Sequence, residues 1–353
     1  MFDIAWIGIA YLCGLAARPF GLPPLVGYLL AGFVLHAIDI RTGDTLAELS
    51  ELGITLLLFS IGLKLNLRSL LQRHVWGVTG IHMSVTTLGL FGGLLLLSAA
   101  GVGLTGQLTV LQALVVAFAL SYSSTVFAVK VLEARGDMQS NYGSAAIGIL
   151  IIQDLAAVGF LALSAGKLPS PWAVLLLLVF WPGRPLLRQL LTRTGHGELL
   201  ILFGLSVAVG GAQLFDMFGV KGDLGALLIG VLLASHPGAT ELSKSLLGFK
   251  DLFLVGFFLT VGLTGTPGVE ALALAVLLVG LLPLRTWLYF RLFARFGLRA
   301  RSSLLSAFGL STYSEFGLIV ASAAAAQGLL PPEWLGTLAI TLALSFVAAS
   351  PIN

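Results

Sequence analysis

Residues 148–163 read GILIIQDLAAVGFLAL, and this stretch sets Gln153 and Asp154 midway along an otherwise apolar run. A charged side chain at the centre of a membrane helix costs between ~2.5 and more than ~10 kcal/mol, so such residues pair, line water-filled cavities or take part in transport. The rest of the sequence has to indicate what compensates the cost of burying Asp154.

The chain as a whole is poor in charge. Its 353 residues are 58% hydrophobic and 10% charged, with a mean hydropathy of +1.02, whereas soluble domains carry roughly 25% charged residues. In lipid the backbone must satisfy its own hydrogen bonds, so apolar runs of about 20 residues become helices. The composition therefore predicts an all-α polytopic membrane protein. Cys13, the only cysteine, excludes an internal disulfide and a cysteine metal cluster.

About thirteen apolar runs are separated by charged or Pro/Gly-rich breaks. The first run has no basic region ahead of it, so we expect an uncleaved span rather than a signal peptide. The expected spans cover residues 3–17, 23–38, 46–63, 75–99, 108–129, 142–165, 171–190, 198–215, 222–235, 249–265, 269–290, 301–327 and 332–350.

Basic residues gather in alternate loops between these spans. Fifteen lie in one set of loops, namely Arg18, Lys64, Arg68, Arg73, Lys130, Arg135, Arg184, Arg188, Arg193, Lys244, Lys250, Arg291, Arg295, Arg299 and Arg301. The other set has three, Arg41, Lys167 and Lys221. Because loops rich in Lys and Arg stay in the cytoplasm, this partition supports the span count. It predicts an N-terminus outside the cell and a C-terminus in the cytoplasm.

Three pairs of segments resemble each other in the same order and at similar spacings along the chain. The pairs are VGYLLAGFVL (26–35) with LGALLIGVLL (224–233), FSIGL (59–63) with LTVGL (259–263), and YSSTVFAV (122–129) with TYSEFGLI (312–319). The matched units begin an odd number of spans apart, so we expect the halves to have opposite orientations. Inverted repeats, here approximately 23–165 and 222–350, are typical of secondary transporters with a midplane binding site.

Hydroxyl residues cluster in the middle of two matched spans, in LSYSSTVF and LSTYSEFG. Serine and threonine can satisfy backbone groups released where a membrane helix breaks, although they also allow close helix packing. Because the cluster recurs at both repeat positions, we favour a discontinuous helix in each repeat. Such breaks direct helix ends and free carbonyls at a small cation.

Asp154 and Glu315 are the acidic residues well inside apolar runs, and Arg285 is the one basic residue placed there. A buried carboxylate can hold either a proton or a monovalent cation, because desolvation favours the protonated form and a nearby cation the ionised form. Exchange is obligatory if only the loaded protein can reorient. Gln153 can donate to the carboxylate or offer an oxygen to the ion, and Arg285, if near Asp154, can replace the missing cation. The alternative is that these charges form structural ion pairs.

At these residues the chain resembles the Kef branch of the monovalent cation/proton antiporters, the bacterial glutathione-regulated potassium-efflux systems. The combination of Gln153-Asp154 with Ser314-Glu315-Phe316 is the most specific part. The likeness covers essentially the whole chain, through VGYLLAGFVL, LLLFSIGL, SSTVFAV, GILIIQDLAAV, GALLIGVLLAS, GFKDLFLVGFFLTVGL, SEFGLIVASAAAAQGLL and ALSFVAASPI.

The resemblance implies thirteen transmembrane helices in two inverted repeats, with crossed discontinuous helices, a dimerisation bundle and a mobile core. It implies that Asp154 binds the ion and couples it to the proton, that Gln153 marks this branch, and that Arg285 compensates charge. It also implies a homodimer in the lipid of the bacterial inner membrane. One-for-one K⁺/H⁺ exchange is then expected. The residues matched to the two crossover breaks are Ser123, Ser124 and Thr125, and Ser314 and Glu315.

Some positions depart from the family's pattern. Thr312 stands where relatives often have Gln, Lys64 where an acidic residue is common, and SHPGATELSKSLLGFKD (235–251) has fewer acidic residues than the family's regulatory loop. We interpret residues 1–353 as a single transmembrane transport domain. Relatives continue into a cytosolic nucleotide-binding domain, and the ending ASPIN leads us to expect a truncated unit. Any nucleotide or glutathione cofactor is assigned to that further domain, because no Gly-rich dinucleotide fingerprint occurs here.

K⁺/H⁺ antiport is the favoured function, and an Na⁺/H⁺ antiporter or a gated potassium channel without proton coupling are the alternatives. The sequence has no TVGYG-like filter, which disfavours a channel. A scaffold or sensor would leave Asp154 without a purpose. We expect no enzyme, no resident metal and no nucleic-acid partner, since no nucleophile–base pair or ligand set stands out. His36, His82 and His236 are scattered, and we expect each to be packed or interfacial.

Overall fold

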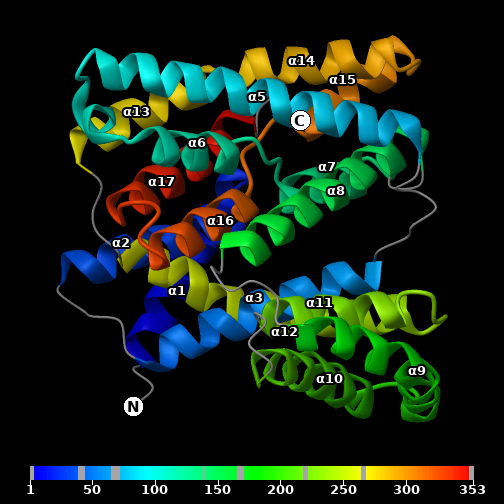
Figure 1. The fold of residues 1–353 in the computed structure, drawn as a ribbon. Helices are drawn as coiled ribbons and strands as arrows, with labels where there is room; N and C mark the ends of the chain where they lie inside the picture. Colours follow the sequence, from blue (N-terminus) through cyan, green and yellow to red (C-terminus); the bar gives the residue numbers. More distant parts are fainter. Residues whose placement is uncertain are drawn as a thin grey trace. The chain divides into compact units, whose positions relative to one another are not determined.

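Helix dominates the computed structural model, which describes residues 4–38, 44–64, 72–137, 140–164, 171–217, 222–263 and 268–349. No strand occurs in these ranges, as Figure 1 shows, so the all-α prediction is confirmed. Arg41, Arg68, Lys167, Lys221 and residues 350–353 lie outside them. The α-helices are α1 (Ile4–Ala17), α2 (Pro24–Ala37), α3 (Asp44–Lys64), α5 (Arg73–Ala99), α6 (Val110–Ala119), α7 (Thr125–Ala134), α8 (Asn141–Ser164), α9 (Pro171–Thr194), α10 (Glu198–Met217), α11 (Gly222–Leu233), α12 (Ala239–Leu263), α13 (Val269–Gly280), α14 (Leu282–Arg295), α15 (Ala300–Gly309), α16 (Glu315–Ala326) and α17 (Glu333–Ala349).

Each expected span coincides with one helix or with two helices in series. Six helices in the described ranges are long and apolar enough to cross a membrane, and further apolar helices of 10–17 residues accompany them. The protein is therefore a multi-pass membrane protein, and the number of thirteen crossings stays a prediction. The expected span 249–265 begins earlier, at Ala239, because Leu242 and Leu246 extend an apolar helix face into a buried cluster.

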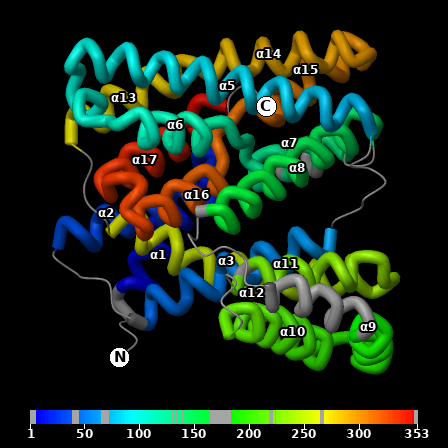
Figure 2. Tube along the Cα trace, viewed as in Figure 1, coloured from blue at the N-terminus to red at the C-terminus, as the bar shows by residue number. Residues whose placement is uncertain are grey.

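The chain groups into two compact units, and the first contains residues 42–67 and 158–260. In this unit α11 packs against α3, α10 and α9; Figure 2 draws α10 and α11 in the green to yellow-green part of the colour scale. Leu56, Phe59, Leu233 and Leu242 are fully buried members of its core. The apolar faces of these helices are thus covered by each other.

The second unit contains residues 3–41, 68–157 and 261–353. Within it α5 packs against α6 and α14, α16 packs against α6 and α17, and α14 packs against α15. The short helices α6 and α16 lie side by side (Figure 1). Asp154, Arg285, Glu315 and both hydroxyl clusters all belong to this unit.

Both predicted helix breaks are present. The first separates α6, which ends at Ala119, from α7, which begins at Thr125, and the second separates α15, ending at Gly309, from α16, beginning at Glu315. The helix ends before and after each break correspond in the alignment that pairs YSSTVFAV with TYSEFGLI. The two repeats therefore interrupt their helices at equivalent residues.

Glycines at matching repeat positions meet in a reciprocal way. A Cβ on Gly62 would lie 2.3 Å from the Leu227 oxygen and 2.9 Å from Gly230 Cα. A Cβ on Gly262, the repeat partner of Gly62, would lie 2.6 Å from Gly32 Cα, and Gly32 is the repeat partner of Gly230. In both contacts a glycine on a helix of one repeat packs against a glycine on a helix of the other repeat. The two contacts involve equivalent positions, as two related repeats predict.

Candidate ion-binding site

The first break, residues 120–124, leaves carbonyl groups at the end of α6 without partners from their own helix. Arg285 on α14 satisfies them. Its guanidinium donates to the Leu120 oxygen at 2.7 Å and the Ser121 oxygen at 2.9 Å, and also to the Tyr122 oxygen. A cation at this position also compensates the negative end of the helix dipole. The side chain is buried, with 5% of its surface exposed.

After the second break, Ser314 and Glu315 stabilise the start of α16. The Ser314 hydroxyl accepts a hydrogen bond from Phe316 N–H at 3.1 Å, and Glu315 is the first residue of α16. A carboxylate there lies at the positive end of the helix dipole. In the first break Ser124, the repeat equivalent of Ser314, accepts from Phe127 N–H at 3.2 Å. Equivalent serines therefore begin both continuing helices.

Two hydrogen bonds join the two breaks directly. Ser124 N–H donates to the Thr312 oxygen at 3.4 Å, and the Ser124 hydroxyl donates to Glu315 Oε2 at 2.9 Å. Behind them, a Cβ on Gly317 would lie 2.0 Å from the Ala119 oxygen, so α16 and α6 touch through their backbones. The crossed arrangement expected from the resemblance is thus present.

Gln153 links α8 to the first break. Its Oε1 accepts from Ser123 N–H at 2.9 Å, and its Nε2 donates to the Tyr289 hydroxyl at 2.9 Å. That hydroxyl also lies 2.8 Å from Ser123 Oγ. Both ends of the amide are therefore used to hold the break in place, whereas the sequence led us to expect contacts with the carboxylate or the ion. Its role toward the ion stays a prediction.

Asp154 follows Gln153 within α8 and is 4% exposed. It lies midway along a continuous helix, so neither end of α8 itself accounts for its charge. Its neighbour in the chain, Gln153, is hydrogen-bonded to Ser123 in the first break. Asp154 is thus a buried carboxylate beside the break, in the same unit as Arg285 and Glu315.

Three hydroxyl groups around the breaks are buried and have no hydrogen-bond partner in the described part of the chain. They belong to Tyr122, Thr125 and Thr312. Tyr122 and Thr312 are equivalent in the repeat, since each opens its segment of the third matched pair. Hydroxyl oxygens with unused lone pairs are what a small cation takes as ligands when it sheds water. Thr125 was predicted for this site, and Tyr122 and Thr312 are additions from the structure.

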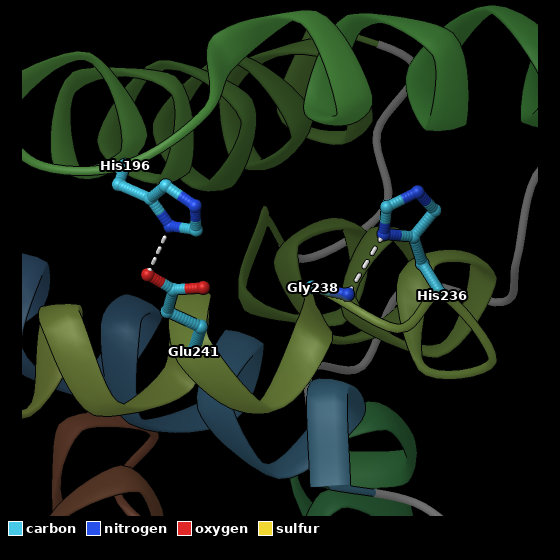
Figure 3. A network of polar contacts seen from close by, with 4 residues as sticks. All are labelled: His196, His236, Gly238 and Glu241. Carbon is cyan, nitrogen blue, oxygen red and sulfur yellow. Dashed lines mark hydrogen bonds and ion pairs between the residues drawn. The ribbon is translucent and has the colours of Figure 1, made fainter.

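The histidines are spread over several elements of the structure. Among the described residues there is no group of three His, Cys, Asp or Glu side chains suited to a metal. His36 contacts the Leu263 oxygen at 3.0 Å. In the other unit, His196 pairs with Glu241 and His236 accepts from Gly238 N–H (Figure 3).

Long apolar helices, two of them broken and joined at a buried polar centre, define an α-helical multi-pass membrane protein with paired discontinuous helices. The chain belongs to the sodium/hydrogen exchanger family, whose transmembrane model matches residues 7–352. The glutathione-regulated potassium-efflux system protein KefC of Salmonella heidelberg is 31% identical over 99% of this chain. KefC of Salmonella typhi matches with the same identity and coverage. The resemblance to the Kef branch is confirmed.

The chain spans about three fifths of the length of these curated relatives, since the match covers 59% of each. Among solved structures, the sodium proton antiporter MjNhaP1 from Methanocaldococcus jannaschii matches with a TM-score of 0.60. That match covers 98% of this chain and 94% of MjNhaP1 at 15% sequence identity. At this identity the likeness shows the fold alone.

Proposed function

We propose that the protein exchanges a monovalent cation for protons, with K⁺ as the preferred cation and Asp154 as the shared binding group. The observation that carries this is the way the buried charges are distributed. Arg285 is matched to the carbonyl end of α6 and Glu315 to the start of α16. Asp154 sits in mid-helix, away from both ends of α8.

Competition between the proton and the cation follows from this placement. Desolvation favours the neutral, protonated acid, and a cation held by the carboxylate and neighbouring hydroxyl oxygens favours the ionised form. The unpartnered oxygens of Tyr122, Thr125 and Thr312 supply such ligands. Because one carboxylate holds one or the other, we propose exchange of one cation for one proton.

Proton flux in proteoliposomes tests the proposal. A pH-sensitive dye follows pulses of K⁺, Na⁺ or choline across a preset pH gradient, for the wild type and for Asp154→Asn. We expect proton movement driven by K⁺ that disappears in Asp154→Asn, while the matched control Asp216→Asn, a carboxylate near the end of α10, keeps it. A response to Na⁺ alone would favour the second candidate, an Na⁺/H⁺ antiporter, which the match to the sodium/hydrogen exchanger family supports. K⁺ flux without proton movement, persisting in Asp154→Asn, would instead indicate a channel.

We also propose a bacterial inner-membrane protein, present as a homodimer, with its N-terminus outside. Orientation can be measured in a Cys13→Ser background with single cysteines at exposed loop positions. Val102→Cys should react with a membrane-impermeant maleimide in intact cells, whereas His196→Cys should react only after lysis. The reverse pattern would contradict the orientation that the basic loops predict.

A further inference from the structure

His82 is a buried polar residue that the site described above leaves unexplained. It lies on the packed face of α5 with Val75, Val78, Thr79 and Met83, at helical spacing. Its side chain is 0% exposed. By distance and angle, neither of its ring nitrogens has a hydrogen-bond partner in the described part of the chain, although the Arg285 backbone lies near the ring.

An imidazole in this state is costly. Each buried polar atom without a partner costs about 1–3 kcal/mol compared with one that is satisfied. An aliphatic residue such as leucine would fill an apolar helix face without that cost. Local rules of this kind are broken mainly at functional sites, so the surroundings of His82 need an explanation.

The imidazole stacks face to face on Tyr289 of α14, with ring centroids 3.4 Å apart and an angle of 11° between the planes. Tyr289 is itself fully buried. Its hydroxyl is the group that meets Gln153 Nε2 and Ser123 Oγ. Only the Tyr289 ring therefore separates His82 from the hydrogen bonds that hold the first break against α8.

The stack fixes the plane of the phenol ring, and the direction of the hydroxyl follows from that plane. Two six-membered rings avoid a direct face-to-face arrangement and slide to an offset one. A five-membered imidazole has a different charge distribution and a smaller outline, so it can cover the phenol centrally. A change at His82 is thus transmitted to Ser123 and Gln153 by movement of one hydroxyl.

We propose that His82 is a positioning residue of the ion site, which sets the affinity for the cation by fixing the Tyr289 hydroxyl between Gln153 and Ser123. The inference rests on the proposed exchange function for its main readout. The imidazole acts through its ring plane, and Arg285 on α14, a charged group that faces it, keeps its own contacts with the break. Tyr289 is the other titratable group packed against it.

The test compares His82→Leu, which removes the ring plane, with His82→Phe, which keeps a ring. We expect His82→Leu to raise the K⁺ concentration for half-maximal exchange about three- to tenfold, and His82→Phe to raise it less than about threefold. The pH profile of exchange should keep its shape in both. Met83→Leu, at the next residue on the same helix face, is the matched control and should match the wild type.

A double-mutant cycle identifies the route. Tyr289→Phe keeps the stack and removes the hydroxyl, so it should mimic His82→Leu, and the combined variant should be no worse than either one. Additive losses would overturn the proposal. So would an unchanged half-saturation in His82→Leu, or an altered pH profile in His82→Phe, since the latter would show that the imidazole itself carries a proton.

A second readout separates this inference from the proposed function. The unfolding temperature of the purified protein, measured against K⁺ concentration, reports cation binding without transport. If the wild type binds K⁺ without exchanging it, the exchange proposal fails, and a weaker K⁺-dependent stabilisation in His82→Leu still supports the positioning role. If His82→Leu binds and exchanges K⁺ as the wild type does, the positioning role alone fails.

Discussion

The Ser124 hydroxyl donates a hydrogen bond to Glu315 Oε2 over 2.9 Å, although the two residues are 191 positions apart. The same hydroxyl oxygen accepts from Phe127 N–H and so caps α7. One serine thus begins the helix after the first break and ties it to the helix after the second. The two halves of the site are held together by an atom that also serves local helix geometry.

Replacing this serine should therefore have two costs. We expect Ser124→Ala to lower stability by about 1–3 kcal/mol, from a lost cap and a lost hydrogen bond to Glu315, and to slow exchange. Ser311→Ala is the matched control, because the Ser311 hydroxyl bonds locally to the Phe308 oxygen. Thermal unfolding and proton flux of both variants decide the matter. Equal losses of stability and exchange rate in the two variants would show that the hydrogen bond between the breaks contributes no more than a local serine hydrogen bond.

Arg285 should not be replaceable by lysine. The guanidinium reaches three carbonyls and the Ser123 hydroxyl at once, whereas an ammonium is a point charge without this planar fork. Each charge-assisted hydrogen bond is worth about 1.5–3 kcal/mol, so we expect Arg285→Lys to lower the maximal exchange rate about tenfold or more and Arg285→Gln to lower it further. Wild-type rates in Arg285→Lys would show that charge alone is required.

The reciprocal glycine contacts predict equal sensitivity at two distant positions. Gly62→Ala and Gly262→Ala should each destabilise the protein by about 1–3 kcal/mol or more, because the added methyl group meets backbone atoms that cannot move aside. Gly89→Ala on α5 has open space at that point and should be neutral or slightly stabilising. Unfolding temperatures in detergent measure all three. A tolerated alanine at either contact would contradict the close backbone approach.

The turn before α12 should respond to pH. Burial first, and the charge of Arg188 second, lower the pKa of His236 from its ordinary value of 6.5. The unfolded chain therefore holds the proton more tightly, and the stability that neutral His236 contributes is lost as the pH falls below about 6.5 toward the lower folded-state pKa. The proton would also occupy Nδ1, which accepts from Gly238 N–H (Figure 3).

Amide exchange at Gly238, corrected for its intrinsic pH dependence, measures this effect. We expect less protection at about pH 5 than at about pH 8 in the wild type, and a smaller difference in His236→Asn, whose side-chain oxygen accepts at any pH. His196→Gln is the control, because the His196–Glu241 pair is exposed and contributes little. Protection that is the same at both pH values would contradict the role of His236.

The sequence allowed the breaks to be predicted but not all of their partners. Hydroxyl residues in the middle of an apolar run stand out locally, and their recurrence at the matching place in the second repeat located both breaks. Tyr289 meets Gln153 across 136 positions of the chain through helix packing, and no periodicity encodes that meeting. His82 was expected to be packed or interfacial, because a buried imidazole on an apolar face looks the same in sequence whatever it contacts.

The partners of Arg285 were also not predictable from the sequence. A lone arginine in a span is easily recognised as costly, and we expected it to compensate a missing cation near Asp154. Its hydrogen bonds go to the carbonyls of the first break. Backbone carbonyls exist at every residue and leave no mark in the sequence, so only the position of the helix end reveals them. Whether Arg285 also replaces the cation during exchange stays a prediction.

The exchanged glycine faces carry a consequence for how the chain matures. Gly32 meets Gly262 and Gly62 meets Gly230, so neither contact can form until the later half has been synthesised. At about 5–20 residues per second, those roughly 170–230 further residues take on the order of 10–50 s. Throughout that interval the glycine faces of the early helices are uncovered in the membrane, where they can contact other chains. The nascent first half is therefore the stage at which this protein most needs protection.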